Sequence, residues 1–244
     1  MGAGSIGIIH RTVSWPQFWT SLNRLQKPKG APCYVINVEG TSMHKQRNQV
    51  VAEAMRLGCD WLLFCDDDHV TPPDFLQRLL AWNVPFVGGL YFTRTPPHHT
   101  TCLRENKVWT KSENRFTTLD KHEFCGTGLA PVDVLGMGFT LIRREVFEAV
   151  CPFDPQKIDR DNPPSWFEMQ DFGTDDVAFC VKARDAGYQP HVDLSMVVPH
   201  LALKAVVWNG QNLQICDPQL SVDIANQYHG VEVAQPVVTE LVSA

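Results

Sequence analysis

The chain has 244 residues, of which 44% are hydrophobic and 8 are cysteines, and its formal net charge is −6. This length is sufficient for one domain with a sizeable core and no disulfide support. The negative charge disfavours a dedicated nucleic-acid-binding protein, because such a protein neutralises phosphates with basic side chains. The cysteines show no C-x-x-C pair and no zinc-like spacing, which indicates small buried residues in a reducing compartment.

Membrane insertion and secretion are disfavoured as well. No apolar stretch approaches the roughly 20 residues that a membrane-spanning helix needs. The N-terminus lacks the basic and then apolar segments that are typical of a signal peptide. We therefore expect a soluble cytoplasmic protein with no membrane span.

Strands and helices alternate in the first part of the chain. Strand-like apolar runs occur at residues 5–10, 33–38, 61–65 and 85–92. Segments with helical spacing of apolar side chains lie between them, at residues 16–26, 44–57 and 72–82. This order predicts an α/β fold with a mostly parallel central sheet, flanked by helices in right-handed crossovers.

Two of the helices have recognisable starts. We expect the helix at 44–57 to be capped by Thr41 or Ser42. The next helix should begin at Pro72, with Thr71 as its cap and Asp74 in its first turn.

The alternation breaks at residues 93–130, where polar sequence with prolines and histidines predicts a loop-and-hairpin insertion. Regular structure resumes with a predicted strand at 132–142. Gly136 and Gly138 lie within it, where glycine usually marks a bulge or a close approach to a ligand. The remaining predicted elements are a helix from 144, a helix from 175, a strand at 192–198, and a hairpin at 206–215 that turns at Asn209 and Gly210.

Three adjacent acids, Asp66, Asp67 and Asp68, follow the apolar run at 61–65. Neighbouring carboxylates raise each other's pKa values unless a cation or hydrogen-bond donors compensate them. The end of a buried strand is also where open α/β sheets bind ligands. The motif therefore predicts a site for a metal-bound phosphate, and a solvated acidic turn is the alternative.

A second acidic motif, Asp175 and Asp176, lies at a predicted helix start. With Thr174 as a cap, each acid would stabilise the helix by roughly 0.3 to 1 kcal/mol through its interaction with the helix dipole. This would explain the two acids by helix stability alone. His200, at the end of a later strand, and the first acidic motif favour a functional site instead.

Four segments resemble, in order, the motifs of GT-A fold glycosyltransferases, especially family 2-like enzymes. They are DWLLFCDDDHVTPPDFL (60–76), VDVLGMGFTLIRREVF (132–147), GTDDVAFCVKARDAGY (173–188) and VVPH (197–200). The resemblance covers residues 6–200. It implies a GT-A domain at 1–200, with the insertion at 93–130 on the acceptor side. Residues 201–244 would then be an extension that packs on the core or in a dimer.

The resemblance assigns a D-x-D motif to Asp66 and Asp68. Asp68 would ligate a Mn²⁺ or Mg²⁺ ion that bridges the donor diphosphate, and oxygen ligands suit these ions. Asp66 would contact the ribose, or the metal through water, and Asp67 would lie beside the donor. His200 resembles the histidine that completes the metal coordination in many of these enzymes.

Other donor contacts follow from the same resemblance. The segment QRNQVVAEA (46–54) resembles the A-R-N helix of the family, which places Arg47 near the nucleotide. His10, Arg11 and Thr12 follow the first strand and would lie near the base. Gly136 and Gly138 would line the floor of the sugar and acceptor site.

Asp176 corresponds to the catalytic base of inverting members, and Asp175 precedes it. The predicted function is metal-dependent transfer of a sugar from a nucleoside-diphosphate sugar to a hydroxyl, with inversion of the anomeric configuration. A UDP-sugar is the first candidate for the donor. Some GT-A relatives with the same metal motif retain configuration, so the stereochemistry stays open.

Two other functions remain open. A nucleotidyltransferase has similar metal chemistry, but its Gly-rich basic loop after the first strand is missing here. A non-catalytic nucleotide- or sugar-binding module is the other alternative. The acceptor is also open between saccharide, lipid-linked glycan, protein and nucleic-acid base, and a homodimer is possible. The insertion, with Arg94, His98, His99 and Trp109, is expected to frame the acceptor.

Overall fold

The computed structural model describes residues 2–10, 15–40, 42–107, 115–119, 128–171, 173–202, 205–208 and 213–216. The chain forms two compact units, Met1–Leu201 and Ala202–Ala244. In the second unit, β11 (Ala205–Trp208) pairs antiparallel with β12 (Leu213–Cys216). This confirms the predicted hairpin strands, while Asn209 and Gly210 lie outside the described residues. The role of this unit as a cover for the core or a dimer contact stays a prediction.

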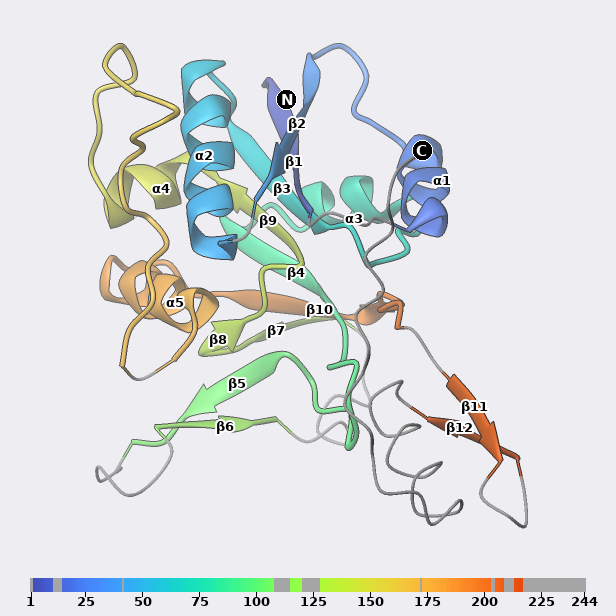
Figure 1. The fold of residues 1–244 in the computed structure, drawn as a ribbon. Helices are drawn as coiled ribbons and strands as arrows, with labels where there is room; N and C mark the ends of the chain where they lie inside the picture. Colours follow the sequence, from blue (N-terminus) through green and yellow to red (C-terminus); the bar gives the residue numbers. More distant parts are fainter. Residues whose placement is uncertain are drawn as a thin grey trace, which may run out of the picture. The chain divides into compact units, whose positions relative to one another are not determined.

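The first unit is built on a seven-stranded sheet with the strand order β2-β1-β3-β9-β4-β10-β7 (Figure 1). β1, β2 and β3 run parallel to one another, and β4 runs parallel to β10. β9 lies antiparallel between β3 and β4, and β7 is antiparallel to β10. The strands are β1 (Gly4–His10), β2 (Cys33–Glu39), β3 (Trp61–Asp66), β4 (Phe86–Leu90), β7 (Leu129–Pro131), β9 (Phe139–Arg143) and β10 (His191–Val197). The mostly parallel α/β sheet confirms the predicted fold class.

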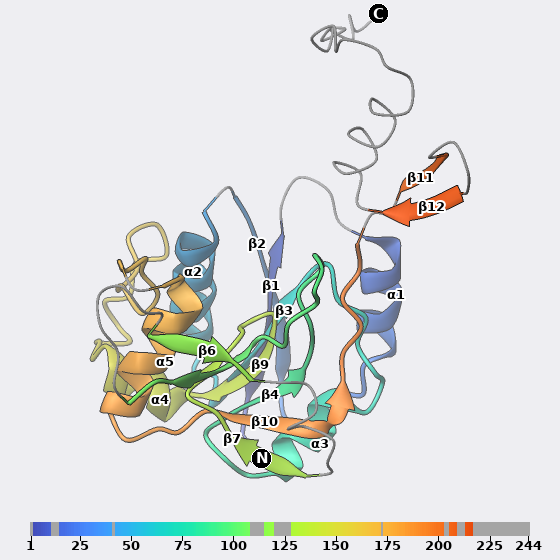
Figure 2. The same cartoon turned by 90° about the horizontal axis from the view of Figure 1, so that it is seen from below.

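Helices cover both faces of this sheet (Figures 1 and 2). One face carries α1 (Pro16–Arg24) and α3 (Phe75–Ala81). The other face carries α2 (Met43–Arg56), α4 (Arg144–Val150) and α5 (Asp175–Asp185). In the described part of the chain, no helix is both long and apolar enough to cross a membrane.

Strand β3 is buried on both faces of the sheet, which explains the continuous apolar run at residues 61–65. Leu62 and Phe64 belong to the core on the α2 face, while Leu63 and Cys65 belong to the core on the α1 face. Successive side chains of a strand point to opposite faces, so a strand that is buried on both faces has no polar positions. The first polar residue, Asp66, therefore falls where the strand leaves the core.

The predicted start of the third helix is wrong. α3 begins at Phe75 with Asp74 at its N-cap, so neither Thr71 nor Pro72 is helical. Each of these two residues precedes a proline, and the proline ring disfavours the α conformation in the residue before it. The Thr71 N–H instead donates a hydrogen bond to Ser21 Oγ, at 3.0 Å.

The predicted strand at 132–142 is also wrong. It divides into β8 (Val134–Leu135), a turn, and β9. β8 joins β5 (Cys102–Glu105) and β6 (Phe116–Thr118) in a separate three-stranded sheet. Gly136 and Gly138 lie in the turn at 136–138, where a Cβ atom would collide with the Tyr91 hydroxyl at Gly136 and with the His69 ring at Gly138. The glycines therefore mark a change of sheet, which sequence periodicity did not reveal.

Many of the predicted site residues lie along one edge of the main sheet. The parallel strands β1, β3, β4 and β10 all end at this edge, which we call the carboxyl edge. β9 runs the other way and so begins there, which brings the turn at 136–138 to the same place. Ligands of open α/β sheets bind outside the carboxyl ends of the strands.

Candidate active site at the carboxyl edge

The segment after β3 pairs with the segment after β10. His69 and His200 form an antiparallel bridge, and the Leu201 N–H donates to the Asp68 carbonyl oxygen at 2.6 Å. The Val70 N–H donates to the Pro199 carbonyl oxygen at 3.0 Å. These backbone bonds bring His200 beside the acidic motif, although the two lie far apart in the sequence.

Asp68, His69 and His200 form a compact cluster of metal-ligand atoms, which all lie within 4.8 Å of one another. Asp68 Oδ1 lies 3.1 Å from His69 Nδ1, and Asp68 Oδ2 lies 3.3 Å from His200 Nε2. The two imidazole rings stack with centroids 4.3 Å apart and an angle of 13° between their planes. The cluster is therefore held in place by ring packing as well as by the backbone bridge.

The hydrogen bond of His200 to Phe92 bears on whether a cation fits the cluster. His200 Nδ1 lies 2.8 Å from the carbonyl oxygen of Phe92, so Nδ1 carries a proton, because a carbonyl oxygen only accepts. In the neutral ring, the Nε2 lone pair then faces the Asp68 carboxylate. Two acceptors at this distance require a proton or a cation between them.

Unpaired buried atoms support the same conclusion. Asp66 Oδ1 and His69 Nε2 are buried and have no hydrogen-bond partner among the described residues. Buried polar groups are normally paired, and unpaired ones are often explained by an ion or water. The residues present thus fit a divalent cation that is bound through carboxylate oxygens and imidazole nitrogens.

The three adjacent acids have different electrostatic environments. Burial alone would raise the pKa of Asp68, but its interactions with His200 and His69 outweigh this effect and lower the pKa below its ordinary range. Burial, together with the charge of Asp68, raises the pKa of Asp67 to about 6. Burial also raises the pKa of Asp66, against the opposing charge of Arg47. Asp68 is therefore the acid that most strongly favours its ionised form.

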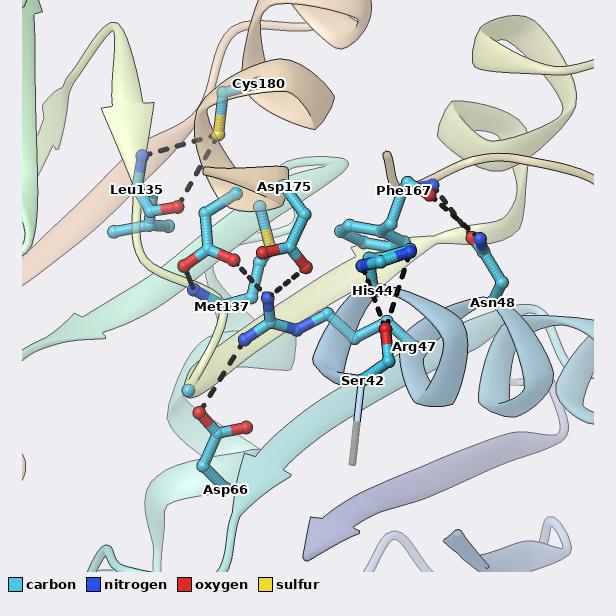
Figure 3. Close-up of polar contacts among 12 residues, drawn as sticks. Ser42, His44, Arg47, Asn48, Asp66, Leu135, Met137, Phe167, Asp175 and Cys180 are labelled. Carbon is cyan, nitrogen blue, oxygen red and sulfur yellow. Dashed lines mark hydrogen bonds and ion pairs between the residues drawn. The ribbon is translucent and has the colours of Figure 1, made fainter. Parts of the chain in front are cut away.

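A second cluster surrounds Arg47, which lies within α2 and is 2% exposed (Figure 3). Its Nη1 atom donates to Asp175 Oδ2 at 2.6 Å and also to Asp176 Oδ1. Its Nη2 atom lies 3.7 Å from Asp66 Oδ2. The guanidinium carbon lies 5.9 Å from the centre of the Phe167 ring. One buried cation therefore links the acids of α5 to the end of β3.

The charges in this second cluster shift each other's pKa values. Burial alone would lower the pKa of Arg47, but the surrounding carboxylates outweigh it and raise the pKa. Burial raises the pKa of Asp176 to about 6; Arg47 opposes this effect, and the neighbouring charge of Asp175 adds to it. The Met137 N–H also donates to Asp176 Oδ2 at 3.2 Å, which favours the ionised form.

Of the residues predicted to contact the base, one ends a strand at the carboxyl edge and the others lie outside the described part. His10 ends β1, and its carbonyl oxygen accepts a hydrogen bond from Gln46 Nε2 at 2.9 Å. Arg11, Thr12 and Trp109 lie outside the described residues. The donor contacts predicted for these positions, and for Arg47, stay predictions.

The two glycines of the turn pack against the protein itself. The Gly138 N–H donates to Tyr91 Oη at 2.9 Å, and a Cβ atom on Gly138 would lie 2.8 Å from His69 Cε1. A Cβ atom on Gly136 would also meet the Tyr91 hydroxyl. Small residues are therefore required here for the packing of Tyr91 and His69. The predicted role of Gly136 and Gly138 as the floor of a sugar site stays a prediction.

Sequence reasoning missed His69, Tyr91 and the contact of Arg94 with Asp68. His69 directly follows the acidic motif and is a common ligand type, so its position was a usable signal. Nothing in the sequence distinguished Tyr91. The expectation that Arg94 frames the acceptor stays a prediction; its Nη1 atom lies 3.1 Å from Asp68 Oδ2, beside the metal-ligand cluster.

Comparison of the sequence with protein-family models and with curated proteins finds no match. Solved structures do match the fold. A197 from STIV covers 88% of this chain and 94% of its own length, with a TM-score of 0.50 and 18% identity. GalNAc-T7, solved with UDP, GalNAc and Mn²⁺, covers 82% of this chain with a TM-score of 0.53 and 11% identity. The aligned region is 44% of that second structure. The chain has the GT-A glycosyltransferase fold that its motifs predict.

Replacing Arg47 with glutamine should lower the free energy of unfolding by about 3 to 5 kcal/mol, because buried carboxylates lose their cation. Adding Asp175→Asn should restore part of this loss by removing one of those unpaired charges. Urea denaturation at neutral pH measures both effects. Arg56→Gln, at the exposed end of the same helix, is the matched control and should leave the unfolding free energy nearly unchanged. Equal losses in Arg47→Gln and the control would contradict this role of Arg47.

Proposed function

We propose that this protein is a metal-dependent glycosyltransferase, which moves a sugar from a nucleoside-diphosphate sugar to an acceptor hydroxyl. The observation that carries the proposal is the position of the Asp68, His69 and His200 cluster at the same carboxyl edge as Asp176. A metal site beside a buried, oriented carboxylate is the combination that such a transfer needs. The UDP and Mn²⁺ bound in the GalNAc-T7 structure make these two ligands the first candidates.

Asp68 and His200 would hold the metal ion, with His69 and Asp66 beside them. When bound, a divalent cation neutralises charge that develops on the leaving diphosphate. The imidazole nitrogens favour Mn²⁺, since Mg²⁺ is usually bound by carboxylates, phosphates and water. The chain's own contribution is to keep Asp68 ionised and to orient His200 through the Phe92 carbonyl.

Asp176 would act as the general base. The acceptor oxygen forms a bond to the anomeric carbon while the bond from that carbon to the diphosphate oxygen breaks, and the hydroxyl proton passes to the Asp176 carboxylate. The Asp176 side chain is 23% exposed, whereas that of Asp175 is 8% exposed, so Asp176 is the more accessible of the two acids. A single displacement of this kind inverts the anomeric configuration.

Arg47 and Met137 would orient that base. Each donates a hydrogen bond to a different oxygen of Asp176, which fixes the plane of the carboxylate. A carboxylate oxygen has two lone pairs, so Oδ2 can still accept the acceptor proton while it is bonded to Met137. Asp175 shares the Nη1 atom of Arg47 and would act as a positioning residue rather than a base.

Calorimetric titration of UDP should show binding that depends on Mn²⁺ and is lost in Asp68→Ala, since this variant removes a carboxylate that two histidines and the metal would share. Titration of GDP tests nucleotide preference in the same experiment. Asp74→Ala, at an exposed position outside the cluster, is the control and should bind like the wild type. Absence of UDP and GDP binding to folded protein would contradict the proposal. Binding without turnover for any nucleotide sugar would favour a non-catalytic module.

Asp176→Asn should reduce sugar transfer by about 10² to 10⁴-fold, the usual contribution of a positioned general base. Binding of UDP with Mn²⁺ should stay close to the wild-type value, because Asp176 lies outside the metal-ligand cluster. Turnover and calorimetry measure the two quantities separately. Asp185→Asn, at the exposed end of the same helix, controls for the loss of one charge. Near-normal turnover in Asp176→Asn would exclude the base role.

The pH dependence of kcat/KM should follow the ionisation of Asp176 in the enzyme without substrate. Its pKa is raised to about 6, and only the ionised form accepts a proton. Activity should therefore rise as the pH increases through about 6 and reach a plateau above it. A flat profile across this range in wild-type enzyme would contradict the assignment. The Asp185→Asn control should reproduce the wild-type profile.

A further inference from the structure

Arg94 contacts the metal-ligand cluster from the segment that joins β4 to β5 (Figure 1). Its Nη1 atom lies 3.1 Å from Asp68 Oδ2, and His200 Nε2 lies 3.3 Å from the same oxygen. Two nitrogen groups therefore share one carboxylate oxygen. A metal ion bound by Asp68 would need that same carboxylate.

The position of the arginine is set by its surroundings. Phe92 and Thr100 form an antiparallel bridge, and the Thr93 N–H donates to the His99 carbonyl oxygen at 2.8 Å. The Phe92 carbonyl oxygen also bonds to His200 Nδ1. The backbone on either side of the arginine is thus tied to itself and to a candidate metal ligand. Its side chain is 42% exposed, so it borders solvent into which it could turn when the contact with Asp68 breaks.

A divalent cation at Asp68 would repel the guanidinium, because both carry positive charge and both would contact one carboxylate. The donor diphosphate arrives with the metal and carries several negative oxygens. A guanidinium binds two phosphate oxygens at once through its planar set of donors. The diphosphate would therefore offer a new partner to the displaced side chain.

We propose that Arg94 exchanges Asp68 for the donor diphosphate when the metal and nucleotide bind, and so makes their binding cooperative. This inference rests on the proposed function. Metal alone would break the ion pair between Arg94 and Asp68 without offering a replacement anion. Metal with diphosphate offers one, so each ligand increases the affinity for the other by the same factor.

Arg94→Gln should therefore shift two affinities in opposite directions. Binding of Mn²⁺ alone should tighten about two- to fivefold, which is the range expected for a partly exposed ion pair that no longer competes. Binding of UDP in the presence of Mn²⁺ should weaken by about tenfold or more, since a charge-assisted contact to phosphate is lost. The factor by which Mn²⁺ increases UDP affinity should fall accordingly.

Calorimetric titrations of Mn²⁺ alone, and of UDP and inorganic pyrophosphate with saturating Mn²⁺, measure these effects without turnover. Arg56→Gln removes the same charge from the exposed end of α2, far along that helix from Arg47, and should match the wild type. Arg94→Lys keeps the charge but loses the planar donor set, so its UDP affinity should lie between those of the wild type and Arg94→Gln. Pyrophosphate should weaken together with UDP if the contact is to phosphate.

Opposite shifts in the two affinities of Arg94→Gln would support the exchange. Unchanged affinities, or weaker binding of Mn²⁺ alone, would overturn it; the proposed function would stand if Asp68→Ala still lost metal-dependent UDP binding. A loss of UDP affinity without a loss of pyrophosphate affinity would also overturn the exchange. Failure of the wild-type protein to bind Mn²⁺ and UDP would overturn the inference and the proposed function together.

Discussion

The candidate site depends on one buried cation. Arg47 is 2% exposed, and it contacts acids that come from β3 and from the start of α5. A buried guanidinium without its carboxylates, or the carboxylates without it, would each be strongly destabilising. Helix α2, helix α5 and the end of β3 must therefore take up one relative arrangement for the core to form. The orientation of Asp176 follows from this electrostatic requirement of the fold.

The turn at 136–138 connects the Arg47 cluster to the metal-ligand cluster. The Met137 N–H donates to Asp176, the Gly138 carbonyl oxygen accepts from the Asp66 N–H, and the Gly138 N–H donates to Tyr91 Oη. Tyr91 in turn packs edge to face against His69, with ring centroids 4.6 Å apart. Because β9 is antiparallel to its neighbours, its first residues lie beside their last ones. A reversed strand in the centre of the sheet is thus what brings the candidate base and the candidate metal site together.

Apolar periodicity predicted most helices and parallel strands, because these patterns are local and the inner parallel strands β1, β3 and β4 are buried on two faces. The acids Asp66, Asp68 and Asp176 were found for a related reason: they stand where buried elements begin or end. The position of β9 between β3 and β4 was not predictable in this way, since it depends on pairing between distant segments. The bridge between His69 and His200 and the contact of Arg94 with Asp68 have the same long-range origin.

The two acidic motifs look alike in sequence, yet the fold shifts the pKa values of Asp68 and Asp176 in opposite directions. Two histidines lower the pKa of Asp68, whereas burial and a neighbouring carboxylate raise that of Asp176 to about 6. A group that binds a cation works best when it is always ionised. A general base works best with a pKa near the operating pH, because it must be ionised and still hold a proton well. The surroundings of the two acids therefore divide these tasks between them, and that division, more than the motifs, supports a catalytic site.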